Sequence, residues 1–220
     1  MNTVPSASGE PPRSGTEFFD SLFESLPVRN TGRFGMPGDP WNLLFIATEA
    51  QLDSALAAAG WAKIALGLLR PFAEGFLQAF RGEFLTRFPP MNTYRLLGAP
   101  QDRNWAQTVI PIEKRHHFRL WRLPYRDKKG RAYWWGSANF DLSVRWRDFS
   151  HVPDPDTVME REYIATSLQG SPWVESISRR RSARIPAEGA NDKGYAFRTD
   201  GSVLLVFLRQ YVLLRAWFPG

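Results

Sequence analysis

The sequence predicts an α+β fold, a two-layer sandwich in which helices cover one face of a mixed or antiparallel sheet in a split β-α-β-like order. A short apolar run of strand length at 41–47 precedes two stretches with helical periodicity. Two longer runs then flank a polar turn that ends in glycine, at 127–130, which is typical of an antiparallel hairpin. A helix start and further strand-length runs follow, and this order of elements indicates helices packed on a sheet.

The composition indicates one sizeable core. The chain has 220 residues, of which 43% are hydrophobic, and it has no cysteine, which excludes disulfides, cysteine-ligated zinc and thiol nucleophiles. Its Ser-, Pro- and Gly-rich start lacks the pattern of a secretory signal peptide. We therefore predict a flexible N-terminal tail over 1–37, with a brief helix at 16–23, and a single domain over 38–220.

The apolar run at 41–47 is expected to form a buried central strand. Thr48 and Gln51 then fit a capping box, in which their side chains satisfy free backbone N–H groups at a helix start. Apolar residues recur at helical spacing up to Ala59, and Gly60 suits the left-handed position just beyond a helix end. These features predict one compact helix directly after the strand.

A second apolar pattern runs over 63–84, with large side chains four residues apart and Pro71, which should kink or divide a helix. Charged residues interrupt the pattern, so it falls short of a transmembrane helix. A helix that covers the core is the favoured interpretation. The alternative is a helix lying on a bilayer surface, for which Phe72, Phe76 and Phe80 are suited.

The second half is predicted to form mainly strands, beginning with a hairpin of 115–123 and 131–146. In its longer strand Trp134 belongs to an apolar set of alternate residues, whereas Asn139 and Asp141 belong to the polar set. Since alternate residues of a strand share a face, the first set should face the core and the second a polar surface or cleft.

After the hairpin, Asp154 and Pro155 are predicted to open a helix as its N-cap and first helical residue. Asp156 and Glu160 are four residues apart and should share one helix face. Later apolar segments predict two strands, followed by an end that is either an edge strand or a docked tail, at 173–177, 202–208 and 210–218.

The net charge of +6 favours an anionic partner. The one dense basic run comprises Arg179, Arg180 and Arg181, with Arg184 close by. We interpret it as a solvated loop, because no aromatic residues interleave it, and nucleic acid is therefore not an expected partner. The alternative is contact with an anionic lipid surface.

All three histidines, His116, His117 and His151, lie in one polar stretch together with several carboxylates. Beside carboxylates, histidine can ligate a metal or transfer a proton near neutral pH. On a regular strand His117 shares a face with Arg115 and Arg119, whereas His116 shares the other face with apolar residues. We therefore expect His117 to face a cleft and His116 to be a buried, hydrogen-bonded structural residue.

These considerations define a candidate site, to which Asn139 and Asp141 of the adjoining strand also project. The catalytic candidates are His117, Asp141, His151 and Glu160. The candidate ligands of a divalent metal are His117, His151 and Asp156. The candidate substrate-binding residues are Arg115, Arg119, Asn139 and Arg161, among which Arg119 and Arg161 could clamp a phosphate. A purely structural interpretation stays open, in which the acidic residues cap and pair and the histidines satisfy buried hydrogen bonds.

Several motifs resemble those of the LssY C-terminal domain family, over roughly residues 38–208. The most specific is Arg-His-His-x-Arg-Leu-Trp, and the motifs lie at 38–42, 94–98, 115–121, 135–141, 154–156 and 199–201. The resemblance implies a bacterial protein whose relatives occur alone or behind membrane-embedded phosphatase-like and DedA-like regions. The family takes its name from a link to a type I secretion locus and has no established biochemical activity.

Two functions are therefore expected. The first is a metal-dependent or acid–base hydrolase acting on a phosphoester or another anionic, lipid-derived substrate. The second is a noncatalytic module that binds a membrane surface or a protein. Both functions fit a cytoplasmic location, and the resemblance implies that the protein could also lie at the surface of the inner membrane. Serine hydrolase and P-loop or Rossmann chemistry are not expected, because the corresponding glycine motifs are missing.

Overall fold

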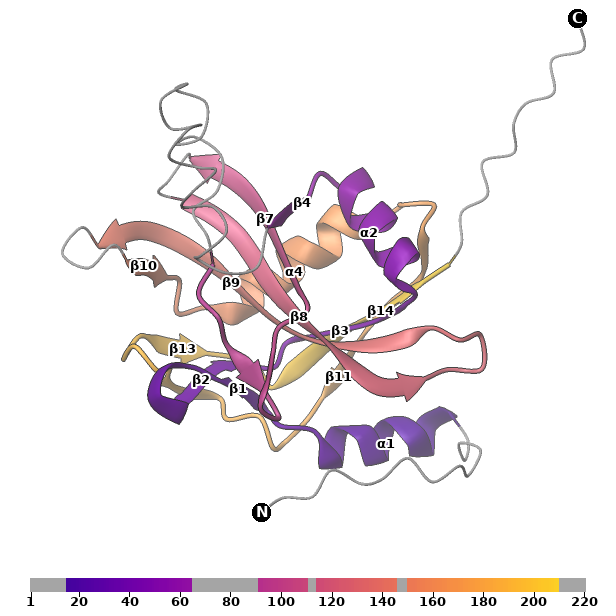
Figure 1. Cartoon of the computed structure of the whole chain (residues 1–220), viewed down its shortest axis with the longest axis horizontal. Coiled ribbons are helices and arrows are strands. Elements are labelled where there is room, and N and C mark those ends of the chain that lie inside the picture. The colour runs from indigo at the N-terminus through magenta and orange to yellow at the C-terminus, as the bar shows by residue number, and fades with distance from the viewer. Residues whose placement is uncertain (1–14, 65–90, 111–113, 146–149, 210–220) are drawn as a thin grey trace, which may run out of the picture.

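The computed structural model describes residues 15–64, 91–110, 114–145 and 150–209. The fold is α+β and mostly sheet (Figure 1). The strands of the main sheet are β3 (Leu43–Ala47), β4 (Ala62–Ile64), β7 (Arg103–Ile110), β8 (Lys114–Arg126), β9 (Ala132–Arg145), β10 (Ser150–Pro153), β11 (Val174–Arg181) and β14 (Ser202–Leu208). The α-helices of the described part are α1 (Gly15–Ser25), α2 (Glu49–Ala58) and α4 (Thr157–Leu168).

The main sheet is mixed. Its strands run in the order β11-β14-β3-β9-β8-β7-β4, and β10 pairs with β9. Among the described strands of this sheet, only the neighbours β3 and β14 pair in parallel, and the long hairpin of β8 and β9 lies near the centre. The predicted hairpin, the central strand and the strands at 173–177 and 202–208 are thus confirmed.

Smaller elements surround one end of the main sheet. A four-stranded sheet comprises β1 (Arg29–Thr31), β2 (Pro37–Pro40), β5 (Arg95–Leu96) and β6 (Ala99–Pro100), and a short 3-10 helix covers Arg33–Gly35. A separate hairpin consists of β12 (Glu188–Ala190) and β13 (Ala196–Arg198). Residues 15–37, which the sequence assigns to a tail, form α1, β1 and the start of β2 in the structure.

The helix after β3 begins and ends as predicted. The Thr48 hydroxyl accepts from the Gln51 backbone at 3.2 Å, and the Gln51 side chain accepts from the Thr48 backbone at 2.8 Å, which completes the capping box. Gly60 has a φ of +81°, as a residue just beyond the helix end requires. The helix predicted over 63–84 is wrong at its start, because Lys63 and Ile64 belong to β4. The rest of that segment and 210–218 lie outside the described residues.

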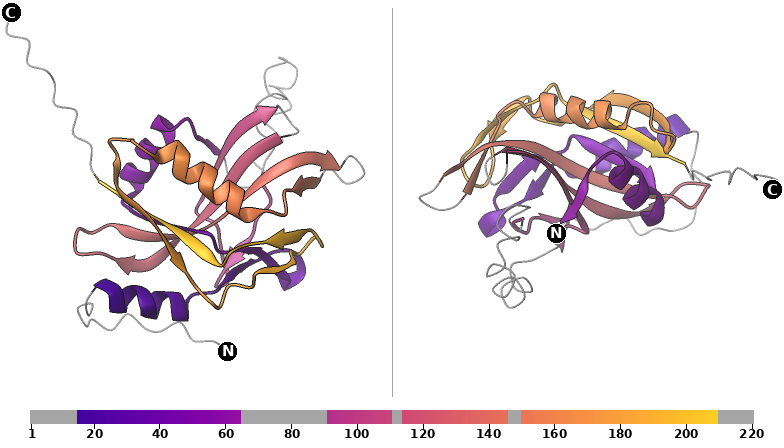
Figure 2. Two further views of the ribbon diagram at one scale, coloured as in Figure 1. Left: turned by 180° about the vertical axis from the view of Figure 1, so that it is seen from behind. Right: turned by 90° about the horizontal axis from the view of Figure 1, so that it is seen from above.

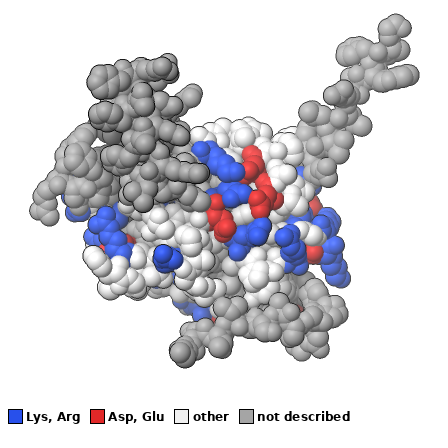
Figure 3. Space-filling model, in the orientation of Figure 1, with Lys and Arg blue, Asp and Glu red and all other residues white. Residues whose placement is uncertain are grey.

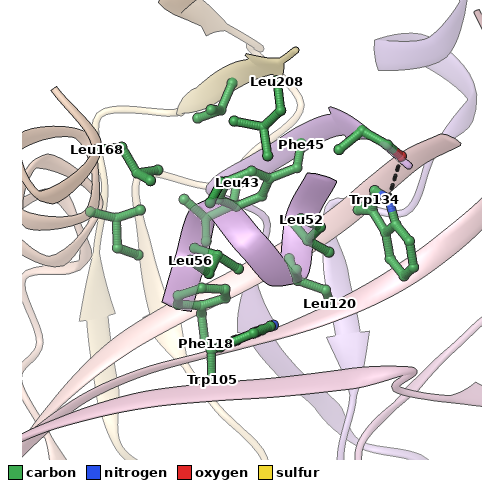
Figure 4. Packing of buried hydrophobic residues seen from close by; sticks show 14 of the residues in the cluster. Leu43, Phe45, Leu52, Leu56, Trp105, Phe118, Leu120, Trp134, Leu168 and Leu208 are labelled. Atoms are coloured by element: carbon green, nitrogen blue, oxygen red, sulfur yellow. Dashed lines mark hydrogen bonds between the residues drawn. The ribbon is translucent and has the colours of Figure 1, made fainter. Parts of the chain in front are cut away.

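Both faces of the central strands are apolar, and each is covered. On one face, α2 and α4 pack Leu52, Leu56 and Leu168 against the sheet, while Trp134 donates to the Ala47 carbonyl at 3.0 Å (Figure 4). Figure 2 shows α4 lying across this side of the sheet in the view from behind. On the other face, α1 inserts Leu22 and Phe23 into a cluster of tryptophans and leucines.

The prediction that helices cover one face in a split β-α-β order is therefore wrong. All five residues of β3 are buried, so the sheet has two apolar surfaces and needs a layer on each. The alternate residues of β9 that were predicted to be polar are polar only in the second half of the strand. In the first half, Trp135 lies on the same side and packs in the apolar cluster with Leu22 and Phe23 of α1. Helix α1 supplies the second layer, which fits its aromatic face.

Two further local predictions need correction. The N-cap of α4 is Asp156 and not Asp154, because the Asp156 carboxylate accepts from the backbones of Val158 and Met159. The basic run is not a loop, because Arg179, Arg180 and Arg181 end the edge strand β11. Its side chains hold other elements together: Arg179 pairs with Glu162, Arg180 pairs with Asp20, and Arg184 donates to the carbonyls of Phe23 and Leu26.

Acidic and basic side chains alternate over the face that carries α2 (Figure 3). Ion pairs of this kind join α2 to its neighbouring strands, namely Lys63–Asp53, Arg103–Glu49 and Arg122–Glu49. Positive charge around α2 is therefore largely matched by carboxylates.

Candidate functional site

A polar cavity of about 240 Å³ lies at one end of the β8–β9 hairpin, on the same sheet face as α1. Its lining comes from segments far apart in the chain. The β8, β9 and β10 strands supply Arg115, His117, Arg119, Asn139, Asp141, His151 and Pro153. The β12–β13 loop supplies Asn191, Lys193 and Tyr195, and the remaining residues are Asp39, Asn92 and Tyr94.

The β-sheet register explains why the strand residues meet. Arg115 is paired with Asp141 and His117 with Asn139, so these four side chains project from adjacent strands on one face. β10 then folds back on β9 and brings His151 beside them. The structure therefore places His117, Asp141 and His151, three of the four catalytic candidates, in one cavity.

Asp141 is the centre of this group. One of its oxygens accepts from Arg115 Nε at 2.8 Å and lies 3.3 Å from His117 Nδ1 and 3.5 Å from His151 Nδ1. Burial raises the pKa of Asp141, but the contacts with His117 and Arg115 outweigh this effect and hold it below its usual value. The carboxylate is thus ionised and is shared by two imidazoles.

The two imidazoles are neutral near pH 7. Burial lowers the pKa of His117 well below its usual value, and Arg119 and Arg115 act in the same direction despite Asp141. Burial and Arg115 also lower the pKa of His151, which is more exposed. Because both Nδ1 atoms face Asp141, the Nε2 atoms at the other end of each ring remain for a ligand in the cavity.

Two further cations, Arg119 and Lys193, also line the cavity. Arg119 is buried and its Nη1 lies 3.6 Å from an Asp39 oxygen, yet its Nε and Nη1 make no hydrogen bond with the described residues. Its guanidinium also stacks on Tyr94, 4.5 Å from the ring centroid. Burial lowers the pKa of Lys193, and the neighbouring Arg119 lowers it further.

The loop that carries Lys193 is anchored on both sides. Tyr94 donates to Asp192 at 2.8 Å, and the Arg33 backbone donates to the same carboxylate at 2.9 Å. Asn191 donates to Asp39 at 3.1 Å. Gly32 is required for this approach, because a Cβ there would lie 2.2 Å from the Asp192 carboxyl carbon. Lys193 therefore has a defined position beside the cavity.

Three sequence-predicted site residues lie elsewhere. Glu160 contacts His116 on the opposite face of β8, with 2.5 Å between Glu160 Oε2 and His116 Nδ1. Arg161 is buried and pairs with Asp200 at 2.6 Å and with Glu162 at 2.8 Å. Asp156 caps α4. The structure separates these residues from the cavity because α4 packs on the far side of the sheet.

The metal set therefore does not assemble as predicted. In the ranges that the structure describes, no group of three or more His, Asp or Glu side chains is placed to hold a metal ion. A cation between His117 and His151 would also lie next to the Arg115 guanidinium, which already holds the shared Asp141 oxygen. The donor set fits a divalent metal poorly.

The sequence alone did not indicate the other half of the lining. Asp39 and Tyr94 lie within motifs of the family resemblance, which was a usable signal. Lys193 and its loop neighbours carried no signal, because a single lysine in a polar turn is common on protein surfaces.

The comparisons identify the family of the chain. In the described residues, no helix is both long and apolar enough to cross a membrane. No similar protein was found among curated proteins or among solved structures. The family model described as LssY C-terminus matches residues 23–203, which includes the described cavity residues of every strand and loop. The chain therefore belongs to the LssY C-terminus family.

Proposed function

We propose that this cavity binds a phosphoester or a related anion and hydrolyses it by acid–base catalysis with His117 and His151. The observation that carries the proposal is the meeting of two imidazoles at one buried Asp141 oxygen, inside a cavity that also holds Arg119 and Lys193. A carboxylate at Nδ1 orients an imidazole so that its Nε2 can exchange protons with a substrate.

The cations support an anionic ligand. Lys193 makes no ion pair within the described part of the chain, and Arg119 has two buried nitrogens without hydrogen bonds there. A buried donor that lacks a partner costs roughly 1–3 kcal/mol. A bound phosphoryl oxygen would satisfy these donors and offset the repulsion between the two cations.

The hydrolysis divides between the two histidines. A water molecule attacks phosphorus while one imidazole accepts its proton, and the bond from phosphorus to the leaving oxygen breaks as the other imidazole donates a proton to that oxygen. His117 is the base, because burial keeps it neutral, and the more exposed His151 is the acid once the bound anion favours its protonated form. Arg119 and Lys193 stabilise the charge on the phosphoryl oxygens.

The test combines binding, turnover and metal content. Calorimetry with inorganic phosphate and a screen of phosphoesters are expected to give binding and turnover that Arg119→Gln reduces strongly. The matched control is Arg122→Gln, three residues along the same strand, because Arg122 is exposed and pairs with Glu49 outside the cavity. Metal analysis of the purified protein and chelator treatment belong to the same experiment.

Three results would contradict the proposal. Turnover that disappears with a chelator and returns with a divalent ion would replace the acid–base mechanism by a metal-dependent one. Phosphate binding without turnover of any phosphoester would support the noncatalytic binding module instead. Equal loss of binding in Arg119→Gln and Arg122→Gln would place the anion elsewhere.

A further inference from the structure

The cavity is lined by groups that bind hydroxyls. Apart from its charged residues and histidines, the described lining consists of amides, phenols and one proline. The amides come from Asn92, Asn139 and Asn191, the phenols from Tyr94 and Tyr195, and the proline is Pro153. Amides and phenols both donate and accept hydrogen bonds, whereas an acyl chain requires aliphatic walls. The lining is therefore suited to a polar ligand.

Asn139 is the most informative of these residues. It lies opposite His117 in the sheet register and is only 5% exposed. Its amide makes no hydrogen bond with other described residues, whereas Asn191 and Tyr94 already bond to Asp39 and Asp192. A buried amide beside the proposed base is thus available for a ligand.

The size of the cavity limits the ligand. Sites for drug-sized ligands usually measure roughly 300–1,000 Å³, and this cavity measures about 240 Å³. A group of a few carbons with its phosphate fits this volume better than a long chain does.

We infer that the group recognised is a polyol or sugar phosphoester, whose hydroxyls bind the Asn139 amide while its phosphate contacts Arg119 and Lys193. This inference rests on the proposed function and names its substrate class. The same chemistry occurs in soluble polyol phosphates and in the polyol headgroups of phospholipids.

The decisive comparison uses two phosphates that differ only in their hydroxyls. Glycerol 3-phosphate and propyl phosphate have the same carbon number and the same charge. Loss of a hydroxyl that contacts a buried polar group reduces recognition strongly. Relative to propyl phosphate, we therefore expect glycerol 3-phosphate to have a Kd that is lower, and a kcat/KM that is higher, by about tenfold or more. Vesicles of phosphatidylglycerol against vesicles of phosphatidylpropanol, which keeps the phosphodiester and its charge but lacks the headgroup hydroxyls, test the headgroup source in the same way.

Variants test whether Asn139 causes the preference for glycerol 3-phosphate over propyl phosphate. Asn139→Leu should bring the ratio of the two substrates close to one, while Arg122→Gln should keep the wild-type ratio. If Asn139→Leu does not fold, as judged by circular dichroism, Asn139→Ser provides the smaller change. An unchanged ratio in the folded variant would overturn the role of Asn139.

The outcomes separate the two proposals. Equal or better use of propyl phosphate would overturn the polyol inference and leave the hydrolase proposal standing. Tighter binding of glycerol 3-phosphate without turnover of any phosphoester would overturn the hydrolase and support the recognition. Absence of binding by all four probes would overturn both.

Discussion

The two faces of strand β8 differ in how their polar groups are satisfied. On the α4 face, His116 lies 2.5 Å from Glu160 and stacks between Tyr163 and Phe140, with ring centroids 3.5 and 4.4 Å away. On the cavity face, the adjacent His117 is 3.3 Å from Asp141 without an aligned hydrogen bond. Of these two neighbouring histidines, His116 thus makes a structural contact with Glu160, whereas His117 lines the polar cavity.

This difference indicates that the α4 face contributes to the stability of the fold and that the cavity face can contact a ligand. Burial raises the pKa of Glu160, and its contact with His116 opposes that effect. Such a buried pair is costly to break, because the Glu160 carboxylate loses the partner that most favours its charged form. The cavity face holds donors, such as Arg119 Nε and Nη1, whose hydrogen bonds a ligand would complete.

The largest expected effect is on activity. His117→Ala should lower phosphoester turnover by about 10²–10⁴-fold, the range for loss of a general base. The fold should remain, because Arg115 still holds Asp141. Turnover and a thermal melt are measured on the same preparation. Wild-type turnover in a folded His117→Ala protein would remove the cavity from the proposed mechanism.

The second effect is on stability and concerns the opposite face. His116→Ala should cost roughly 1–3 kcal/mol of the free energy of unfolding, because Glu160 is left buried without its partner. Turnover per folded molecule should stay close to the wild-type value. Urea unfolding of both histidine variants provides the check. A larger stability loss for His117→Ala than for His116→Ala would reverse the assignment of the two faces.

The alternation of residues in β8 was enough to predict this division. The strand pairs regularly with β9 from Arg115 to Arg122, so parity in the sequence translates directly into faces of the sheet. Parity could not show on which face α4 packs, and Glu160 and Asp156 were therefore expected at the cavity. Lys193 could not be predicted either, because its place depends on long-range contacts of Asp192 and Asn191. Short-range patterns thus predicted the strands, and long-range packing decided the composition of the site.

A third prediction concerns Arg161, which the sequence placed in the site. Its hydrogen bond to Asp200 lowers the pKa of that carboxyl to about 2. Because the folded pKa lies below the ordinary value of 3.8, the pair stabilises the protein above about pH 4, and this stabilisation is lost as the pH falls towards 2. Asp200 is half exposed, so we expect an effect of under about 1 kcal/mol.

Asp200→Asn tests this directly. Its free energy of unfolding should fall below the wild-type value at pH 6, and the difference should shrink at pH 3. Phosphate binding should be the same in both proteins, since Arg161 lies outside the cavity. A change in phosphate affinity would bring Arg161 back into the candidate site.

The smallest effect is expected for Ser137, which is fully buried on the cavity face opposite Arg119. Its hydroxyl has no hydrogen-bond partner in the described part of the chain. Ser137→Ala removes a polar group without leaving a partner unsatisfied, so stability should change by about 0.5 kcal/mol or less in either direction. Asn104 of β7, which pairs with Arg119 from the other side of β8, is equally buried and also lacks partners among the described residues, so water molecules could connect Ser137 and Asn104 with Arg119. In that case Ser137→Ala would cost more than about 1 kcal/mol and would weaken phosphate binding, and the cavity face would then contribute to stability as the α4 face does.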